Sequence, residues 1–155
     1  MGNGRRELAE VNVYRGQPSP ERDPKGARAF GRQVHAWSLE SLTRGVTRPL
    51  NYRTDPPREK GIDVQLAVDA VAGAIRDEYD VAVFFTEDTD LIPALELVAE
   101  VKGRDGIEVA AWVPDAGSDR RLRLEEKYPW CHRLDRGDYQ HVRDDTDYTL
   151  RSRRR

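Results

Sequence analysis

The chain has 155 residues, which favours a single domain and is long enough for a hydrophobic core. A single cysteine, Cys131, rules out an internal disulfide and is typical of a reducing, cytoplasmic environment. The first ten residues are polar and charged, and no stretch of about 18 apolar residues is present. We therefore expect a soluble cytoplasmic protein that does not associate with a membrane.

The net charge of −2 conceals an uneven distribution. Residues 1–60 carry 12 Lys and Arg against 7 Asp and Glu. Residues 61–101 carry one basic residue against 10 acidic ones, and residues 102–155 carry 13 basic against 11 acidic. An acidic segment between two arginine-rich ones suits a metal site that also binds a polyanion. The alternative is that this segregation along the sequence disappears when the chain folds.

The hydrophobic pattern predicts strands that alternate with helices. This alternation indicates an α/β fold of three layers, in which a mainly parallel sheet has helices on both faces. We expect residues 8–134 to form the domain, and residues 1–7 and 135–155 to be disordered because they are charged and contain few aliphatic side chains. The expected strands cover residues 8–14, 46–52, 80–86, 107–113 and 130–134, and the expected helices residues 27–42, 62–79, 91–102 and 119–127.

The most informative pattern is a cluster of carboxylates directly after a hydrophobic strand. Residues 81–85 read Val-Ala-Val-Phe-Phe, which is typical of a strand buried on both faces, and the next five read Thr-Glu-Asp-Thr-Asp. Open α/β sheets bind ligands just beyond the carboxyl ends of their strands, and Mg²⁺ prefers carboxylate oxygens. Asp88 and Asp90 are therefore candidate metal ligands. Alternatively, Asp90 caps the helix that follows.

Asp63 is a further candidate, in the first turn of the helix expected at residues 62–79. The alternative is that the helix dipole alone accounts for an acid at this position. Asp69 lies six residues further on, about 120° around the helix, so it cannot easily share a site with Asp63. We expect Asp69 to be an ordinary polar residue.

Two segments resemble the NYN domain, a family of the PIN-like superfamily of metal-dependent ribonucleases. Residues 60–69 read Lys-Gly-Ile-Asp-Val-Gln-Leu-Ala-Val-Asp, and residues 85–93 read Phe-Thr-Glu-Asp-Thr-Asp-Leu-Ile-Pro. Bacterial members of the family pair a Lys-Gly-hydrophobic-Asp motif with a Ser/Thr-x-Asp-x-Asp motif after a hydrophobic strand. The resemblance implies a PIN-like fold in which Asp63, Asp88 and Asp90 are catalytic ligands of Mg²⁺ or Mn²⁺ and Thr86 supports the site.

The sequence departs from the family at its start. NYN domains normally open with a strand that ends in Asp-Gly-x-Asn, whose aspartate is a principal metal ligand, whereas the residues before Leu8 read Met-Gly-Asn-Gly-Arg-Arg-Glu. In the PIN-like arrangement that strand lies in the middle of the sheet, so without it the neighbouring strands need other partners for their backbone groups. Three interpretations remain: a start further upstream, a strand supplied by another chain in a homodimer or strand-swapped assembly, or a catalytically degenerate copy.

The resemblance implies hydrolysis of RNA phosphodiester bonds, with metal-bound hydroxide as the nucleophile. Basic residues would position the phosphates without reading bases, and the candidates are Lys60, Arg15, Arg32 and Arg53. The alternative for each of them is a solvated surface position.

Two other functions compete with this interpretation. One is an RNA-binding or scaffold protein that kept the fold and lost catalysis. The other is a phosphatase of the haloacid-dehalogenase type, which also presents Asp-x-Asp after a strand. That interpretation fits less well because Asp88 and Asp90 lie past the middle of the chain and Asp63 would have no role.

Overall fold

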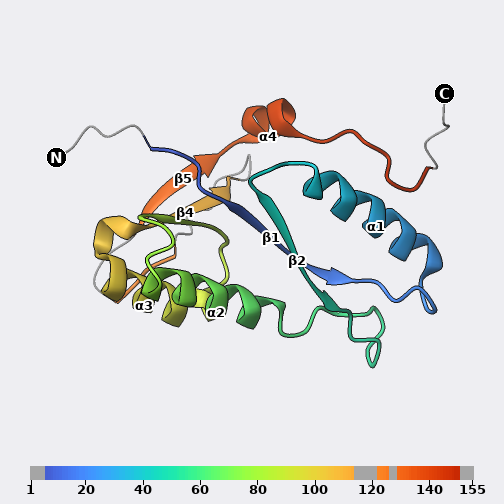
Figure 1. The fold of residues 1–155 in the computed structure, drawn as a ribbon, viewed down its shortest axis with the longest axis horizontal. Coiled ribbons are helices and arrows are strands. Elements are labelled where there is room, and N and C mark those ends of the chain that lie inside the picture. Colours follow the sequence, from blue (N-terminus) through green and yellow to red (C-terminus); the bar gives the residue numbers. More distant parts are fainter. Residues whose placement is uncertain (1–5, 114–121, 126–128, 151–155) are drawn as a thin grey trace. The chain divides into compact units, whose positions relative to one another are not determined.

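The computed structural model describes residues 6–113, 122–125 and 129–150. The chain divides into unit 1, Met1–Asp63 with Thr146–Arg155, and unit 2, Val64–Asp145. In both units the described strands run parallel and helices pack beside them (Figure 1). The α/β class with parallel strands is therefore confirmed.

Unit 1 contains a two-stranded parallel sheet and one long helix. Val11 of the first strand lies opposite Thr43 of the second, and Gln17 lies opposite Pro49, where the second strand ends. The helix runs beside the second strand (Figure 1). The elements of unit 1 are β1 (Val11–Gln17), α1 (Pro24–Ser38) and β2 (Thr43–Pro49).

Helix α1 begins three residues before the start that we expected. Asp23 accepts a hydrogen bond from the backbone nitrogen of Gly26 (2.8 Å) and so caps the helix. Pro24 fits the first helical position, because the amide hydrogen that it lacks has no partner within the helix there. Pro24, which lies before the helix expected at residues 27–42, is thus part of the helix start.

Unit 2 contains a three-stranded parallel sheet in the order β3-β4-β5. Ala82 lies opposite Ile107, and Glu108 lies opposite Trp130, so β4 is the central strand of this sheet. Helix α2 begins with the last two residues of unit 1. The elements are α2 (Ile62–Ile75), β3 (Ala82–Phe85), the 3-10 helix η1 (Thr89–Leu91), α3 (Ile92–Lys102), the 3-10 helix η2 (Arg104–Gly106), β4 (Ile107–Trp112), β5 (Trp130–Leu134) and α4 (Arg136–Val142).

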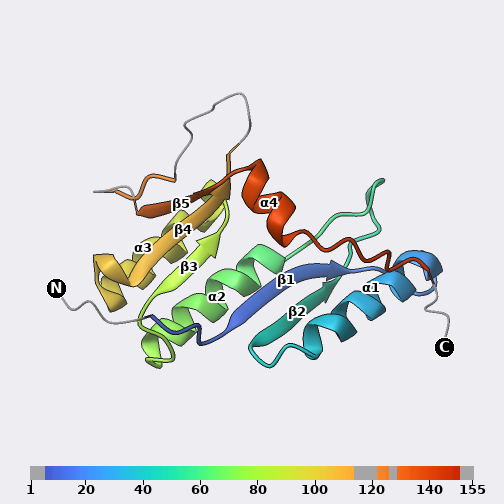
Figure 2. The ribbon, with the colours of Figure 1, turned by 90° about the horizontal axis from the view of Figure 1, so that it is seen from above.

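Helices α2 and α3 cover one face of this sheet and form the core of unit 2 (Figure 2). Phe84 and Val109 point into that core and meet Leu95 and Val98, which are completely buried. The opposite face carries Val83, which is 55% exposed. The expectation that this strand is buried on both faces is therefore wrong: neighbouring residues of a strand point to opposite faces, and helices α2 and α3 cover only one of them.

Two further expectations need correction. Helix α2 ends at Ile75 because Asp77 adopts a left-handed backbone conformation (φ 59°), with the Glu78 amide donating to the Gly73 carbonyl (3.0 Å). The segment after Leu134, which we expected to be disordered, forms helix α4. The helix begins here because Asp135 and Asp138 form a capping box, in which each side chain accepts a hydrogen bond from the backbone nitrogen of the other residue.

Other predictions are less fully covered by the described residues. Most of the helix expected at residues 119–127 lies outside them, and residues 122–125, which are described, are not helical. Among the described helices, none has both the length and the apolar character that crossing a membrane requires. Within the described sheets β1 and β3 each pair with one strand only. We still predict that a further strand pairs with β1 or β3.

Candidate functional site

The acidic loop, Thr86–Asp90, follows directly on the carboxyl end of β3. The hydroxyl oxygen of Thr86 accepts a hydrogen bond from the backbone nitrogen of Asp88 (3.0 Å). Asp88 Oδ1 in turn accepts one from the backbone nitrogen of Asp90 (2.9 Å) and caps η1. The cap is thus Asp88 and not Asp90, and the Thr86 hydroxyl bonds to the backbone of the loop.

The residues on either side of the loop in the sequence are buried in the core, whereas the acidic side chains of the loop are exposed. Phe84, just before it, and Leu91, just after it, are buried in the core of unit 2. Asp88 and Asp90 are exposed, and Thr86 is partly buried. Local backbone bonds therefore fix the position of two accessible carboxylates at the carboxyl end of a parallel strand, where such sheets bind ligands.

Asp63 occupies the first turn of α2 and is exposed. The residue before it, Ile62, is buried, and Gly61 has a positive φ of 74°, which turns the chain into the helix. Asp69 accepts a hydrogen bond from Gln65 Nε2 (2.8 Å), which agrees with its expected role as an ordinary polar residue.

The described residues contain no group of three His, Cys, Asp or Glu side chains placed to hold a metal ion. The structure brings Asp88 and Asp90 together in one loop of unit 2, whereas Asp63 is the last residue of unit 1. A metal site that these three residues share stays a prediction.

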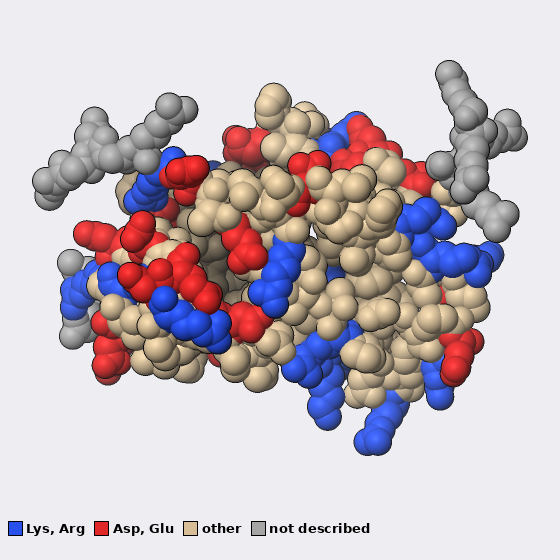
Figure 3. All heavy atoms as spheres, in the orientation of Figure 1, with Lys and Arg blue, Asp and Glu red and all other residues tan. Residues whose placement is uncertain are grey.

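The predicted phosphate-binding residues belong to unit 1. Arg15 is exposed at the edge of a groove of about 360 Å³ that is also lined by Phe30, Leu50 and Glu59. In this groove Glu59 Oε1 accepts a hydrogen bond from the backbone nitrogen of Gly16 (2.6 Å). On the face of unit 1 visible in Figure 3, Lys and Arg side chains project along the lower and right-hand margins.

The other three predicted basic residues differ in their surroundings. Lys60 and Arg53 are exposed. Arg32 is partly buried, and both its Nε (2.7 Å) and its Nη2 donate to the backbone carbonyl of Tyr148. This contact links α1 to residues 146–150 within unit 1, so the structure gives Arg32 a structural role.

The sequence interpretation overlooked a buried carboxylate on β4. Glu108 is buried, and its Oε2 lies 2.7 Å from Nε2 of His132 on β5. A charged residue within an otherwise apolar strand was the signal that could have pointed to this pair. It lies near the start of β5, at the opposite end of the strands from the acidic loop.

Charged groups also perturb one another at the far end of α2. Lys102 lowers the pKa of Asp77 by donating a hydrogen bond to its carboxylate and by its positive charge. Burial raises the pKa of Tyr79, whose hydroxyl donates to the Ala70 carbonyl (2.6 Å). These contacts lie at the turn between α2 and β3.

Comparison with known proteins identifies the family. The model of the NYN domain family matches residues 5–127, so the chain belongs to the NYN domain family. NYN domains are PIN-like, and the parallel α/β arrangement of both units agrees with that fold.

One curated protein resembles most of the chain. It is the 6-hydroxy-3-succinoylpyridine 3-monooxygenase HspA of Pseudomonas putida (strain DSM 28022 / S16), which is 29% identical over 129 residues. The match covers 81% of this chain and 35% of the relative, so the chain spans about a third of the relative's length. No solved structure matches the chain.

Proposed function

We propose that this protein is a metal-dependent ribonuclease that hydrolyses RNA phosphodiester bonds. The observation that carries the proposal is the pair of exposed carboxylates, Asp88 and Asp90, fixed at the carboxyl end of β3. Membership of a PIN-like nuclease family supports it. We include Asp63 as a third ligand because its Lys-Gly-Ile-Asp context matches the family motif.

The donor set suits a hard divalent cation. Mg²⁺ is usually bound through one or two carboxylates, with waters and substrate phosphates completing the coordination, and Asp88 and Asp90 supply such a pair. When bound, Mg²⁺ or Mn²⁺ acts as a Lewis acid and lowers the pKa of a coordinated water. Thr86 contributes by fixing the backbone of Asp88, and Asp88 in turn orients the backbone of Asp90.

Basic residues of unit 1 hold the substrate in this proposal. Arg15, Arg53 and Lys60 are exposed, and their charges suit contacts with phosphate oxygens. Arg32 is left out because its guanidinium binds the Tyr148 carbonyl.

The test is cleavage of a labelled RNA of mixed structure in the presence of Mn²⁺ and of EDTA. Asp88→Asn removes a negative charge while keeping the size of the side chain, so we expect it to abolish cleavage without unfolding the protein. The matched control is Asp105→Asn. Asp105 lies in η2, before the amino end of β4 and therefore at the opposite end of the sheet, and it is exposed. Full activity of Asp88→Asn would contradict the site assignment.

Two alternatives are distinguishable, the first in the same experiment and the second in a separate assay. A protein that binds RNA but does not cut it with any divalent metal would be the binding or scaffold protein. The relative from Pseudomonas putida is named as a monooxygenase. Incubation with 6-hydroxy-3-succinoylpyridine in air, with a nicotinamide reductant to supply the two electrons that monooxygenation consumes, tests for that chemistry by chromatography. Conversion of this compound without RNA cleavage would contradict the ribonuclease proposal.

A further inference from the structure

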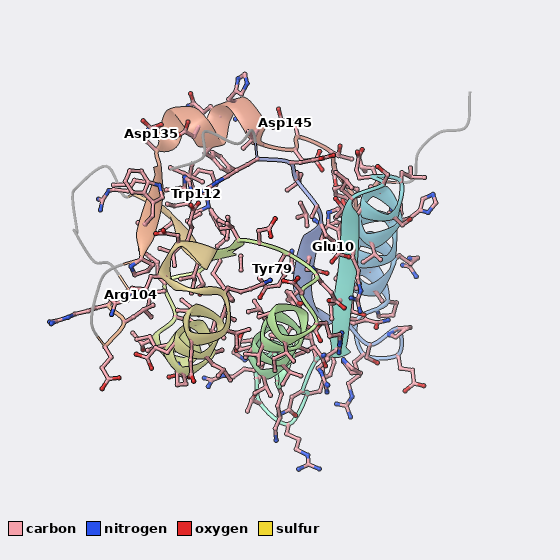
Figure 4. All side chains as sticks on the ribbon, turned by 60° about the vertical axis from the view of Figure 1, so that its left-hand side comes forward. Glu10, Tyr79, Arg104, Trp112, Asp135 and Asp145 are labelled. Atoms are coloured by element: carbon pink, nitrogen blue, oxygen red, sulfur yellow. The ribbon has the colours of Figure 1, made fainter. Side chains whose placement is uncertain are left out.

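Three aromatic rings meet at the carboxyl end of the sheet in unit 2. Phe85 is the last residue of β3, Trp112 the last of β4, and Tyr139 lies in α4, which follows β5. The Trp112 ring centroid lies 5.5 Å from that of Phe85 and 5.6 Å from that of Tyr139. Both pairs are edge-to-face, at 76° and 84°. Figure 4 shows Trp112 close to the start of α4, which Asp135 marks.

These rings, the aromatic cluster, remain accessible. Phe85 is 55% exposed, Trp112 39% and Tyr139 52%. Phe85 and Trp112 belong to the sheet face opposite the core, because Phe84 and Val109 point into the core. Edge-to-face contacts stabilise aromatic pairs by about 0.5–1.5 kcal/mol beyond burial of their area. The cluster is therefore arranged before any ligand binds, and much of its aromatic surface remains open to solvent.

Two arginines flank the cluster, one in the first turn of α4 and one just after its end. Arg136 precedes Tyr139 by three positions, which places both on the same side of the helix, and Arg143 is the residue that follows Val142. Arg143 Nε lies 3.1 Å from Asp145 Oδ1, but both side chains are largely exposed. Such an ion pair contributes about 0–1 kcal/mol, so a phosphate group can compete for the arginine.

The cluster is also continuous with the acidic loop. Phe85 directly precedes Thr86, and the backbone bonds of Thr86 and Asp88 determine the course of the loop. A base stacked on the Phe85 ring would thus bring its own phosphate toward the carboxylates.

We propose that Phe85, Trp112 and Tyr139 form a base-stacking site for unpaired nucleotides, with Arg136 and Arg143 contacting the adjoining phosphates. This inference rests on the proposed ribonuclease function and specifies how its substrate is held. Every base presents a π-face, so stacking tolerates any sequence but requires bases that are not paired in a duplex. The cluster adjoins the acidic loop through Phe85, and this position favours a nucleic acid over a protein as its ligand.

The test measures binding separately from cleavage. A fluorescein-labelled single-stranded RNA of about 12 nucleotides, within the site sizes known for stacking proteins, is titrated with the full chain in EDTA, and a blunt duplex is titrated in parallel. We expect the single strand to bind more tightly. Trp112→Leu and Tyr139→Leu should each raise its Kd about 5- to 160-fold, the range that loss of one stacked base produces. Tyr139→Phe, which keeps the ring, should bind as the parent does.

The matched control is Trp130→Leu. Trp130 is a tryptophan on the same sheet face and is 70% exposed, but it begins β5 and lies at the other end of the strands. Its substitution should leave the Kd unchanged. Circular dichroism checks that each variant is folded, and Tyr139→Leu, at an exposed helix position, keeps the test valid if Trp112→Leu unfolds.

The outcomes separate this inference from the proposed function. Aromatic-dependent binding without metal-dependent cleavage would contradict the ribonuclease and leave the stacking site standing. Equal binding of duplex and single strand, or unchanged binding by Trp112→Leu and Tyr139→Leu, would overturn the stacking site even if cleavage is observed. If the face binds a protein instead, no single-stranded RNA will bind, which also overturns the inference.

Discussion

Unit 1 and unit 2 both contain parallel strands with helices beside them, but they differ in the size of the buried core and in the charged residues that they carry. Unit 2 contains a contiguous core in which Leu95 and Val98 are completely buried. In the described residues of unit 1, the buried apolar side chains are Phe30 and Ile62. The acidic loop lies in unit 2, whereas the predicted phosphate-binding residues lie in unit 1. In the proposed site, the well-packed unit thus carries Asp88 and Asp90, whereas Asp63 and the proposed phosphate contacts Arg15, Arg53 and Lys60 lie in the less packed unit.

A cavity in the core of unit 2 is the most direct test of the difference in packing between the two units. Leu95→Ala removes a completely buried side chain and should reduce the free energy of unfolding by about 2–5 kcal/mol. Urea denaturation measures the loss. The matched control is Leu97→Ala in the same helix: Leu97 is 41% exposed, so its truncation should have a much smaller effect.

Hydrogen exchange of the Leu95→Ala variant then tests whether the units differ in stability. If unit 2 has its own core, amides of β3, β4 and β5 should exchange faster while those of β1 and β2 change less. Equal acceleration in both sheets would show that the two units unfold together, and the distinction between them would apply to structure alone.

A smaller change in the free energy of unfolding is expected from a substitution at Gly16 in unit 1. A Cβ atom added at Gly16 would lie 2.3 Å from Leu50 Cδ2 and 2.7 Å from Glu59 Cγ. Gly16→Ala should therefore destabilise unit 1 by about 1–3 kcal/mol, as overpacking does. The expected signature is faster hydrogen exchange in β1 and β2.

Gly31→Ala is the control for this substitution. Gly31 lies in α1, and no atom lies within 4 Å of the place where a Cβ would be. Alanine is the better helix former, so this change should stabilise by about 0.5–1 kcal/mol. If both glycine variants have the same stability as the parent, the close approach at Gly16 is relieved by small movements and unit 1 is looser than the structure indicates.

The sequence predicted the order of the described helices and strands up to β5 and the position of the acidic loop, because each depends on a local pattern. It did not predict helix α4. The signal at Asp135 was a capping box with aspartate at the third helical position, where glutamate or glutamine is usual. Nor did it reveal the contact between Trp112 and Tyr139, since residues far apart in the sequence meet through the pairing of β4 with β5. Tertiary contacts of this kind leave no periodic trace.

The smallest expected effect concerns the turn after α2 in unit 2. The carboxylate of Asp77 is exposed, whereas the Lys102 side chain that donates to it is 9% exposed and lies 5.6 Å from the centre of the Tyr79 ring. Hydrogen bonding to Lys102, and then its charge, lower the pKa of Asp77 in the folded protein. A lowered pKa stabilises the fold above the pKa of the unfolded chain, about 4. That contribution disappears as the pH falls through the folded-state pKa.

Asp77→Asn tests this contribution without adding backbone strain, because asparagine tolerates the positive φ of this position as well as aspartate does. Thermal melts at a series of pH values from neutral to acidic should show the parent losing slightly more stability than the variant as the pH falls. Asp105→Asn, an exposed acid at η2, should follow the parent. If Asp77→Asn also has the acid sensitivity of the parent, the attraction of Lys102 for Asp77 is screened by solvent. The buried part of Lys102 would then be held by its packing on Tyr79, and the turn would depend on that contact and not on charge.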